Sequence, residues 1–119
     1  MDRLAEAANL SLRVPVVQAV LGDCGTPTLA AAVSNAGALG TVSVGAIRPA
    51  QARRLFARLR SRARRPVLLA FTADWERGEV LDEAVAAGIR HFQVFWWNGE
   101  RLTRRIRAAG ATVIAQVGT

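Results

Sequence analysis

The chain has 119 residues, 51% of them hydrophobic, and carries a formal net charge of +7. This length corresponds to one domain at most, and we expect a single domain over residues 1–119. No apolar run reaches the roughly 18 residues that span a bilayer, and residues 1–13 lack the apolar core of a signal peptide. The only cysteine, Cys24, has no internal disulfide partner. The composition therefore argues against a secreted or membrane-spanning protein and predicts a cytoplasmic one.

All 16 basic residues are arginine, and seven of them lie between Arg53 and Arg65. A basic run of this kind is one signature of a nucleic-acid site. The alternative is an amphipathic helix whose arginines occupy the solvated side. We favour the helix and expect no nucleic-acid partner, because the apolar residues of the segment recur at helical spacing. These residues are Ala52, Leu55, Phe56, Leu59 and Ala63.

The first predicted elements are a strand and a helix. Val14–Val20 is a short apolar run followed by glycines, which is typical of a buried parallel strand. Thr26 and Pro27 then provide a helix N-cap and a proline at the first helical position. The helix is expected over Pro27–Asn35, and Gly37 can take the left-handed conformation that ends it.

The same alternation continues along the rest of the chain. A second strand is predicted over Leu39–Val44, and a second helix opens at Pro49 and ends before Pro66. In the fourth helix, Leu102 and Ile106 should face inward. The remaining elements are strand Val67–Phe71, helix Glu79–Ala87, strand His91–Phe95, a helix capped by Asn98, and strand Thr112–Gln116.

An Ala-Gly pair recurs between a helix and the next strand, at Gly37, Gly88 and Gly110. Repeated units of this kind, joined by short loops, predict an α/β fold with parallel strands and right-handed crossovers. Two architectures fit this pattern: an open doubly wound sheet of flavodoxin type, or about five strands of an eight-stranded (β/α)₈ barrel, which needs roughly 250 residues to close. Both architectures bind ligands at the carboxyl ends of the strands.

Four positions at these strand ends are candidates for a ligand site. Gly22 would let the backbone approach a ligand closely, and Thr72 could donate a hydroxyl, although both residues also suit ordinary turns. Trp96, one of two adjacent tryptophans, suggests the apolar wall of a pocket or a surface covered by a partner. Gln116 points either into a barrel or at a ligand.

The residue types that most often act in catalysis or metal binding show no recognisable arrangement in this sequence. Cys24 has no neighbouring base, Asp23 suits a turn, and His91 begins a strand, at the end that serves stability in barrels. No metal-ligand spacing, paired carboxylates or Ser/His/Asp set appears, nor does a Rossmann glycine motif or a P-loop. No catalytic or metal-binding residue is therefore assigned.

Two segments stand out in the N-terminal part: Val14-Pro-Val-Val-Gln-Ala-Val-Leu-Gly22 and Thr26-Pro-Thr-Leu-Ala-Ala-Ala-Val-Ser-Asn-Ala-Gly-Ala-Leu-Gly40. Both segments resemble the nitronate monooxygenases, formerly called 2-nitropropane dioxygenases. Flavin-dependent enoyl-acyl-carrier-protein reductases and IMP-dehydrogenase-like barrels share this pattern. The resemblance covers about residues 11–119. It implies an incomplete (β/α)₈ barrel, the N-terminal part with about strands one to five of eight, and FMN as the cofactor.

The resemblance also implies which residues meet the flavin. Ala19, Val20, Leu21 and Gly22 match the segment whose backbone lies against the flavin ring. Thr72 matches a position after strand three that contacts FMN in some members, and Gln116 falls where members place a polar or basic group. The sequence departs from the family at Val20, which replaces Pro or Gly, at Leu21, which replaces Met, and at Ala38, which replaces Gly.

The activity implied by the resemblance is oxidation of alkyl nitronates by O₂, with a nitronate or nitroalkane as the small-molecule substrate. The family's catalytic histidine and most of its phosphate site lie beyond strand five, and His91 does not match that histidine. Activity of the chain by itself is therefore not expected. The alternatives are a flavin-dependent enoyl reductase, or a non-catalytic half-barrel remnant that self-associates or pairs with a complementing C-terminal half.

Overall fold

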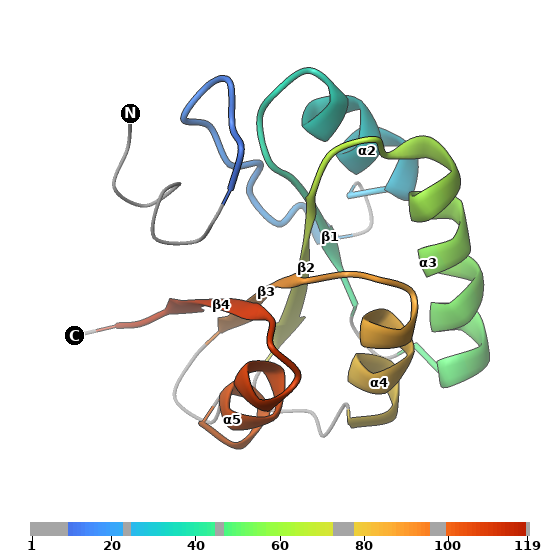
Figure 1. Ribbon diagram of the computed structural model, residues 1–119, viewed down its shortest axis with the longest axis vertical. Coiled ribbons are helices and arrows are strands. Elements are labelled where there is room, and N and C mark those ends of the chain that lie inside the picture. Colours follow the sequence, from blue (N-terminus) through green and yellow to red (C-terminus); the bar gives the residue numbers. More distant parts are fainter. Residues whose placement is uncertain (1–9, 23–24, 45–46, 73–77, 96–99, 119) are drawn as a thin grey trace.

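The computed structural model describes residues 10–22, 25–44, 47–72, 78–95 and 100–118 (Figure 1). Its centre is a sheet of four parallel strands: β1 (Gly40–Ser43), β2 (Val67–Thr72), β3 (His91–Phe95) and β4 (Thr112–Gln116). The strands are hydrogen-bonded in the order β1-β2-β3-β4, which is their order in the sequence. The predicted parallel and sequential arrangement is confirmed for these strands.

Helices α2 (Pro27–Asn35), α3 (Pro49–Arg62), α4 (Gly78–Ala86) and α5 (Glu100–Ala108) all cover the same face of the sheet (Figure 1). A doubly wound sheet carries helices on both faces, whereas sequential strands with helices on one side are the arrangement of a (β/α)₈ barrel. The fold is therefore built of barrel-type units. One buried cluster joins each of these helices to the sheet, through Ala30, Phe56, Leu81 and Ile106 against Val42, Leu69 and Phe92.

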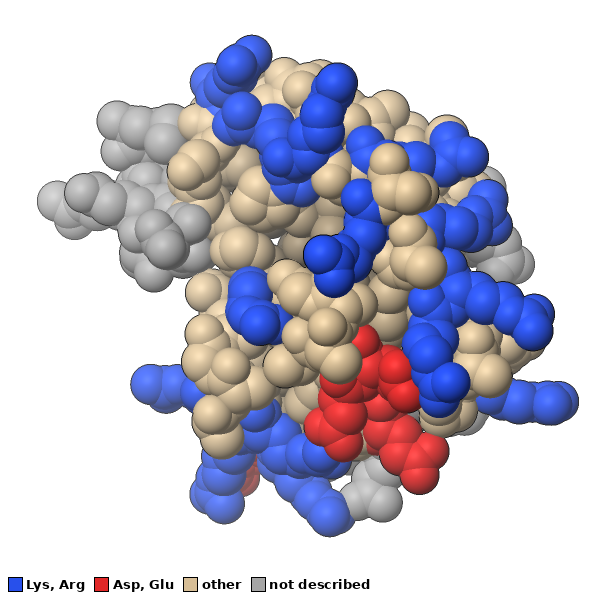
Figure 2. Space-filling view, turned by 45° about the vertical axis from the view of Figure 1, so that its right-hand side comes forward, with Lys and Arg blue, Asp and Glu red and all other residues tan. Residues whose placement is uncertain are grey.

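The predicted helix faces are confirmed. In α3, Ala52, Phe56 and Leu59 are buried, whereas the arginines of the helix are exposed. Figure 2 shows arginines spread over one side of the molecule around a compact acidic cluster. In α5, Leu102 and Ile106 are buried as expected, and Asn98 lies outside the described residues. No helix in the described ranges is long and apolar enough to cross a membrane.

The face of the sheet opposite the helices is only partly covered. Alternate strand residues point to it, and Leu39 and Leu68 form a small buried cluster there with Leu10 from the N-terminal segment. Leu12 and Ile114 pack against this cluster and are partly buried. In a closed barrel this face is the interior, so its polar residues are relevant to ligand binding.

The first predicted strand is wrong in its extent. Instead of a strand over Val14–Val20, the structure has an isolated parallel bridge between Val17 and Leu39. The Gln18 amide donates to the Leu39 carbonyl at 2.9 Å, and the Leu39 amide donates to the Val16 carbonyl at 3.0 Å. This segment therefore lies beside β1 and runs in the expected direction, but it pairs over one short stretch.

The physical reason lies in the composition of the segment and in its surroundings. Pro15 has no amide hydrogen to donate to a ladder. Val14, Val16 and Val17 are 43%, 54% and 41% exposed, so their apolar side chains gain little from burial. An apolar run indicates a strand only where neighbouring elements cover it, and few described residues cover this one.

The Ser-Asn-Ala-Gly-Ala-Leu-Gly motif holds α2 against β1. A Cβ at Gly40 would stand 1.9 Å from the carbonyl oxygen of Ala30, so only glycine allows this approach. The buried Ser34 hydroxyl accepts a hydrogen bond from the Gly40 amide at 2.9 Å. Gly37 has φ +106° and ends the helix as predicted, and Gly88 and Gly110 also have positive φ.

Candidate functional site

The carboxyl ends of three strands form one edge of the sheet. Thr72 of β2 pairs in register with Phe95 of β3, and Phe95 pairs with Gln116 of β4. The prediction that Thr72 and Gln116 lie at the same end of the sheet is therefore confirmed. Gln116 is exposed, so its amide is accessible to a ligand.

Gln18 anchors the segment that leads to this edge. Its side-chain Nε2 donates to the Thr41 carbonyl at 3.2 Å, and its Oε1 accepts from the Thr41 amide at 3.3 Å. The side chain thereby replaces one step of a backbone strand ladder. It directs the following residues along β1 towards the carboxyl edge. The sequence analysis assigns no role to Gln18, although a glutamine within an otherwise apolar run was an available signal.

The loop after Gln18 presents both apolar side chains and backbone donors. Ala19, Leu21 and Gly22 are exposed, Leu21 at 48%, and Val20 is partly buried. Within the described ranges, none of these four amides donates a hydrogen bond. Gly22 has φ +55°, a left-handed conformation that favours glycine. The loop therefore offers an open apolar surface beside N–H groups that donate to no described residue.

A second row of side chains lies directly below the edge on the open face of the sheet. Ser43, Ala70, Gln93 and Ile114 are paired in register across the strands. Gln93 lies between Phe92 and Val94, which point into the helix-covered core, so Gln93 points to the open face. Ser43 and Gln93 are partly buried. Sequence reasoning passed over both, because a polar residue within a strand does not reveal which face it occupies.

Thr41 lies one row further down and carries an orphaned polar atom. The residue is 1% exposed, and its buried Oγ1 has no hydrogen-bond partner among the residues that the structure describes. Its backbone groups, in contrast, are both engaged by Gln18. A buried hydroxyl without a partner costs about 1 to 3 kcal/mol. This atom lies on the open face of the sheet, which becomes the interior of a closed barrel.

Other predicted site residues lie elsewhere. His91 begins β3 in register with Thr112, two residues before Gln93 and at the opposite end of the strand from Phe95. The expectation that His91 is remote from the carboxyl edge is confirmed. Trp96, Asp23 and Cys24 lie outside the described residues. Among the residues that the structure describes, no group of three His, Cys, Asp or Glu side chains is placed to hold a metal ion.

The family model for nitronate monooxygenase matches residues 5–93, which is more than half of the sequence. The chain belongs to the nitronate monooxygenase family. The match includes the anchored loop Ala19–Gly22, β1, β2 and the first residues of β3. The resemblance noted from the two N-terminal segments is therefore confirmed.

Two solved structures have a similar fold. FabK from Thermotoga maritima is 24% identical, with a TM-score of 0.86 over 98% of this chain and 37% of the FabK chain. A nitroalkane oxidase from Streptomyces ansochromogenes is 20% identical, with a TM-score of 0.68 over 92% of this chain and 42% of that chain. This nitronate monooxygenase family chain thus spans less than half the length of either relative. No curated protein is similar enough in sequence to match it.

Both similar structures are barrel enzymes, and the described strands correspond to part of such a barrel. At identities below a quarter, the likeness is one of fold. It explains why all the described helices lie on one side of the sheet. The predicted fold class, parallel (β/α) units of an incomplete (β/α)₈ barrel, is confirmed.

Proposed function

We propose that this chain forms the ring-side part of an FMN site in an oxidoreductase that oxidises alkyl nitronates with O₂. The observation that carries the proposal is the loop Ala19–Gly22, which is open, anchored by Gln18, and directed along β1 towards the edge that holds Thr72 and Gln116. Ligands of (β/α)₈ barrels bind at this end of the strands.

The chemistry of the loop fits a flavin ring. The isoalloxazine system is flat, with apolar faces and a polar edge, so it needs apolar contact on one side and donors on another. Leu21 would supply apolar surface, and the free amides of Ala19–Gly22 would supply donors. The exposed Gln116 amide would add a polar contact, and the backbone of Thr72 ends β2 at the same edge. When bound, FMN supplies the electron transfer that side chains cannot perform.

The catalytic base and the phosphate-binding loops would come from other parts of a barrel. Proton abstraction beside a nitro group requires a base within hydrogen-bond reach of the carbon, and His91 lies at the amino end of β3. Loops after the late strands usually hold the phosphate in (β/α)₈ barrels. We therefore infer that the chain needs a complementing C-terminal half, in the same polypeptide or a second one, to complete the site.

The proposal is tested by adding FMN to the purified chain and following the quenching of flavin fluorescence. We expect weak but saturable binding, with loss of the cofactor on gel filtration, because the chain offers ring contacts without the late-strand phosphate grip. Binding that never saturates would overturn the proposal for this loop.

The substrate is tested in a protein that joins this segment to the later strands of a barrel. Oxygen consumption with propyl nitronate is the expected result. Reduction of a thioester-linked double bond by a nicotinamide, without nitronate oxidation, would instead support the enoyl reductase alternative. The ring-side loop would serve both reactions, so this assay separates the substrate from the cofactor site.

A further inference from the structure

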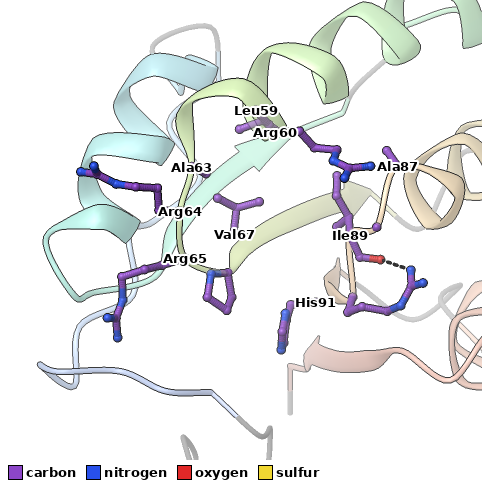
Figure 3. Close-up of a pocket in the computed structure, with 12 residues that line it drawn as sticks. Leu59, Arg60, Ala63, Arg64, Arg65, Val67, Ala87, Ile89 and His91 are labelled. Carbon is purple, nitrogen blue, oxygen red and sulfur yellow. Dashed lines mark hydrogen bonds between the residues drawn. The ribbon is translucent and has the colours of Figure 1, made fainter.

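A pocket of about 390 Å³ lies at the opposite end of the sheet from the proposed flavin site (Figure 3). It is bounded by the end of α3 and by residues 87–90, which lead into β3. Its size falls within the roughly 300–1,000 Å³ typical of small-molecule sites. Because β2 and β3 are flanked by β1 and β4, the pocket is formed without the remaining strands of a barrel.

The floor of the pocket is apolar. Leu59, Val67 and Ile89 contribute buried side chains, and Ala63 and Ala87 are partly buried beside them. Small alanine side chains on facing elements leave the space between α3 and the loop before β3 unfilled. The floor is therefore suited to the apolar or aromatic body of a ligand.

The rim of the pocket is cationic. Arg60 of α3 extends across the opening towards Ala87, and its Nη1 would lie 3.9 Å from a Cβ placed on Gly88 (Figure 3). Arg90 also lines the pocket and is held by hydrogen bonds from Nη1 to the carbonyls of Val85, at 2.9 Å, and Ile89, at 3.0 Å. Those bonds use only Nη1, and a guanidinium carries further N–H donors on Nη2 and Nε.

No carboxylate neutralises these arginines in the part of the chain that the structure describes. No aspartate or glutamate is among the lining residues, and the nearby acids pair with other arginines, Glu83 with Arg53 and Asp82 with Arg105. Arg64 and Arg65 also line the pocket, but their side chains point away from its centre (Figure 3). They add to the positive field without closing the opening.

We propose that this pocket binds a small organic anion, with an apolar or aromatic body on the floor and a carboxylate or phosphate between Arg60 and Arg90. Guanidinium groups recognise both oxyanions through paired N–H donors. An anion between the two arginines would also relieve the repulsion of their charges. The site is separate from the flavin loop and does not depend on the function proposed above.

Equilibrium dialysis of the full chain against 1-naphthyl phosphate and against 1-naphthoate tests the proposal and identifies the preferred oxyanion. Saturable binding of at least one probe is expected, with much weaker binding of the neutral 1-naphthalenemethanol. The variant Arg60→Gln should weaken binding by about tenfold. The matched control Arg58→Gln removes an exposed charge of the same helix outside the pocket and should change the affinity less than about twofold.

A second variant tests the floor without altering charge. Ala87→Leu fills the pocket from the partly buried position opposite Arg60, and it should abolish binding while the far-ultraviolet circular dichroism spectrum stays unchanged. Equal weakening of probe binding by Arg60→Gln and Arg58→Gln would show that the effect comes from the overall positive charge, and this result would overturn the proposal. Undiminished binding by Ala87→Leu, equal binding of the neutral alcohol, or no binding of either anion would overturn it as well.

Discussion

The side-chain amide of Gln18 forms two hydrogen bonds with the backbone of Thr41, one as donor and one as acceptor. This pair, together with the Val17–Leu39 bridge, connects the N-terminal segment to the sheet. It determines where the following loop lies relative to the carboxyl edge. The position of the proposed flavin loop therefore depends on one side chain and one short bridge rather than on a full strand.

Replacement of Gln18 by alanine should destabilise the chain by about 1 to 3 kcal/mol, because the backbone groups of Thr41 lose their partners in a partly buried position. The free energy of unfolding from urea titration measures the effect. Gln116→Ala is the matched control, since that glutamine is exposed and its loss should change stability by less than about 0.5 kcal/mol. Equal stability of the two variants would mean that the Gln18 amide is not an anchor.

Substitution of Gly40 by alanine should be strongly destabilising. The added Cβ would stand 1.9 Å from the Ala30 carbonyl oxygen, so α2 must move away from β1. Overpacking of this kind costs about 1 to 3 kcal/mol or more. Gly118→Ala meets nothing within 4 Å and should leave the thermal midpoint unchanged. Equal thermal midpoints of the Gly40→Ala and Gly118→Ala chains would contradict the close approach of α2 to β1.

The isolated chain should self-associate. Val16 and Val117 are 54% and 82% exposed, and β4 is an edge strand of the described sheet. Unpaired strand edges with apolar side chains favour association. Sedimentation at roughly tens of micromolar should show oligomers, and Val16→Lys with Val117→Lys should shift the population towards monomer. A stable wild-type monomer at that concentration is the outcome incompatible with this prediction.

The chain alone should not oxidise nitronates at a useful rate, even when preformed propyl nitronate removes the need for a base. The rate then depends on retained FMN. We expect the cofactor to be lost, because no loop from the late strands of a barrel is present in the assay to hold the FMN phosphate. An oxygen electrode measures the rate after gel filtration. Stoichiometric FMN and sustained oxygen consumption would instead indicate a self-assembled working enzyme.

The sequence predicted those elements whose signals are local. Thr26 and Pro27 correctly mark the start of α2, where the Thr26 hydroxyl accepts from the Leu29 amide at 3.1 Å. Helical spacing identified the buried face of α3, and three glycines marked the ends of helices. Val14–Val20 has the apolarity of a strand, but strand formation also needs neighbours that cover it, and these cannot be read from the segment itself.

The candidate site was only partly predictable. Thr72 and Gln116 follow from their positions at strand ends, which share one edge in any parallel sheet. The Gln18–Thr41 contact joins residues 23 positions apart, and Arg60 and Arg90 line one pocket from a helix end and from the loop before β3. The first depends on how the N-terminal segment lies against β1, and the second on how α3 packs beside the loop before β3, so composition and spacing do not reveal them.

The affinity of FMN for two matched leucine variants measures the role of the exposed loop most directly. Leu21, in the loop, and Leu29, on α2, are 48% and 38% exposed, so aspartate at either position should be tolerated in the fold. We predict that Leu21→Asp weakens FMN binding by roughly tenfold, equivalent to about 1.4 kcal/mol, while Leu29→Asp leaves it unchanged. Equal affinity of both variants and the wild type would contradict the assignment of Ala19–Gly22 to the flavin site.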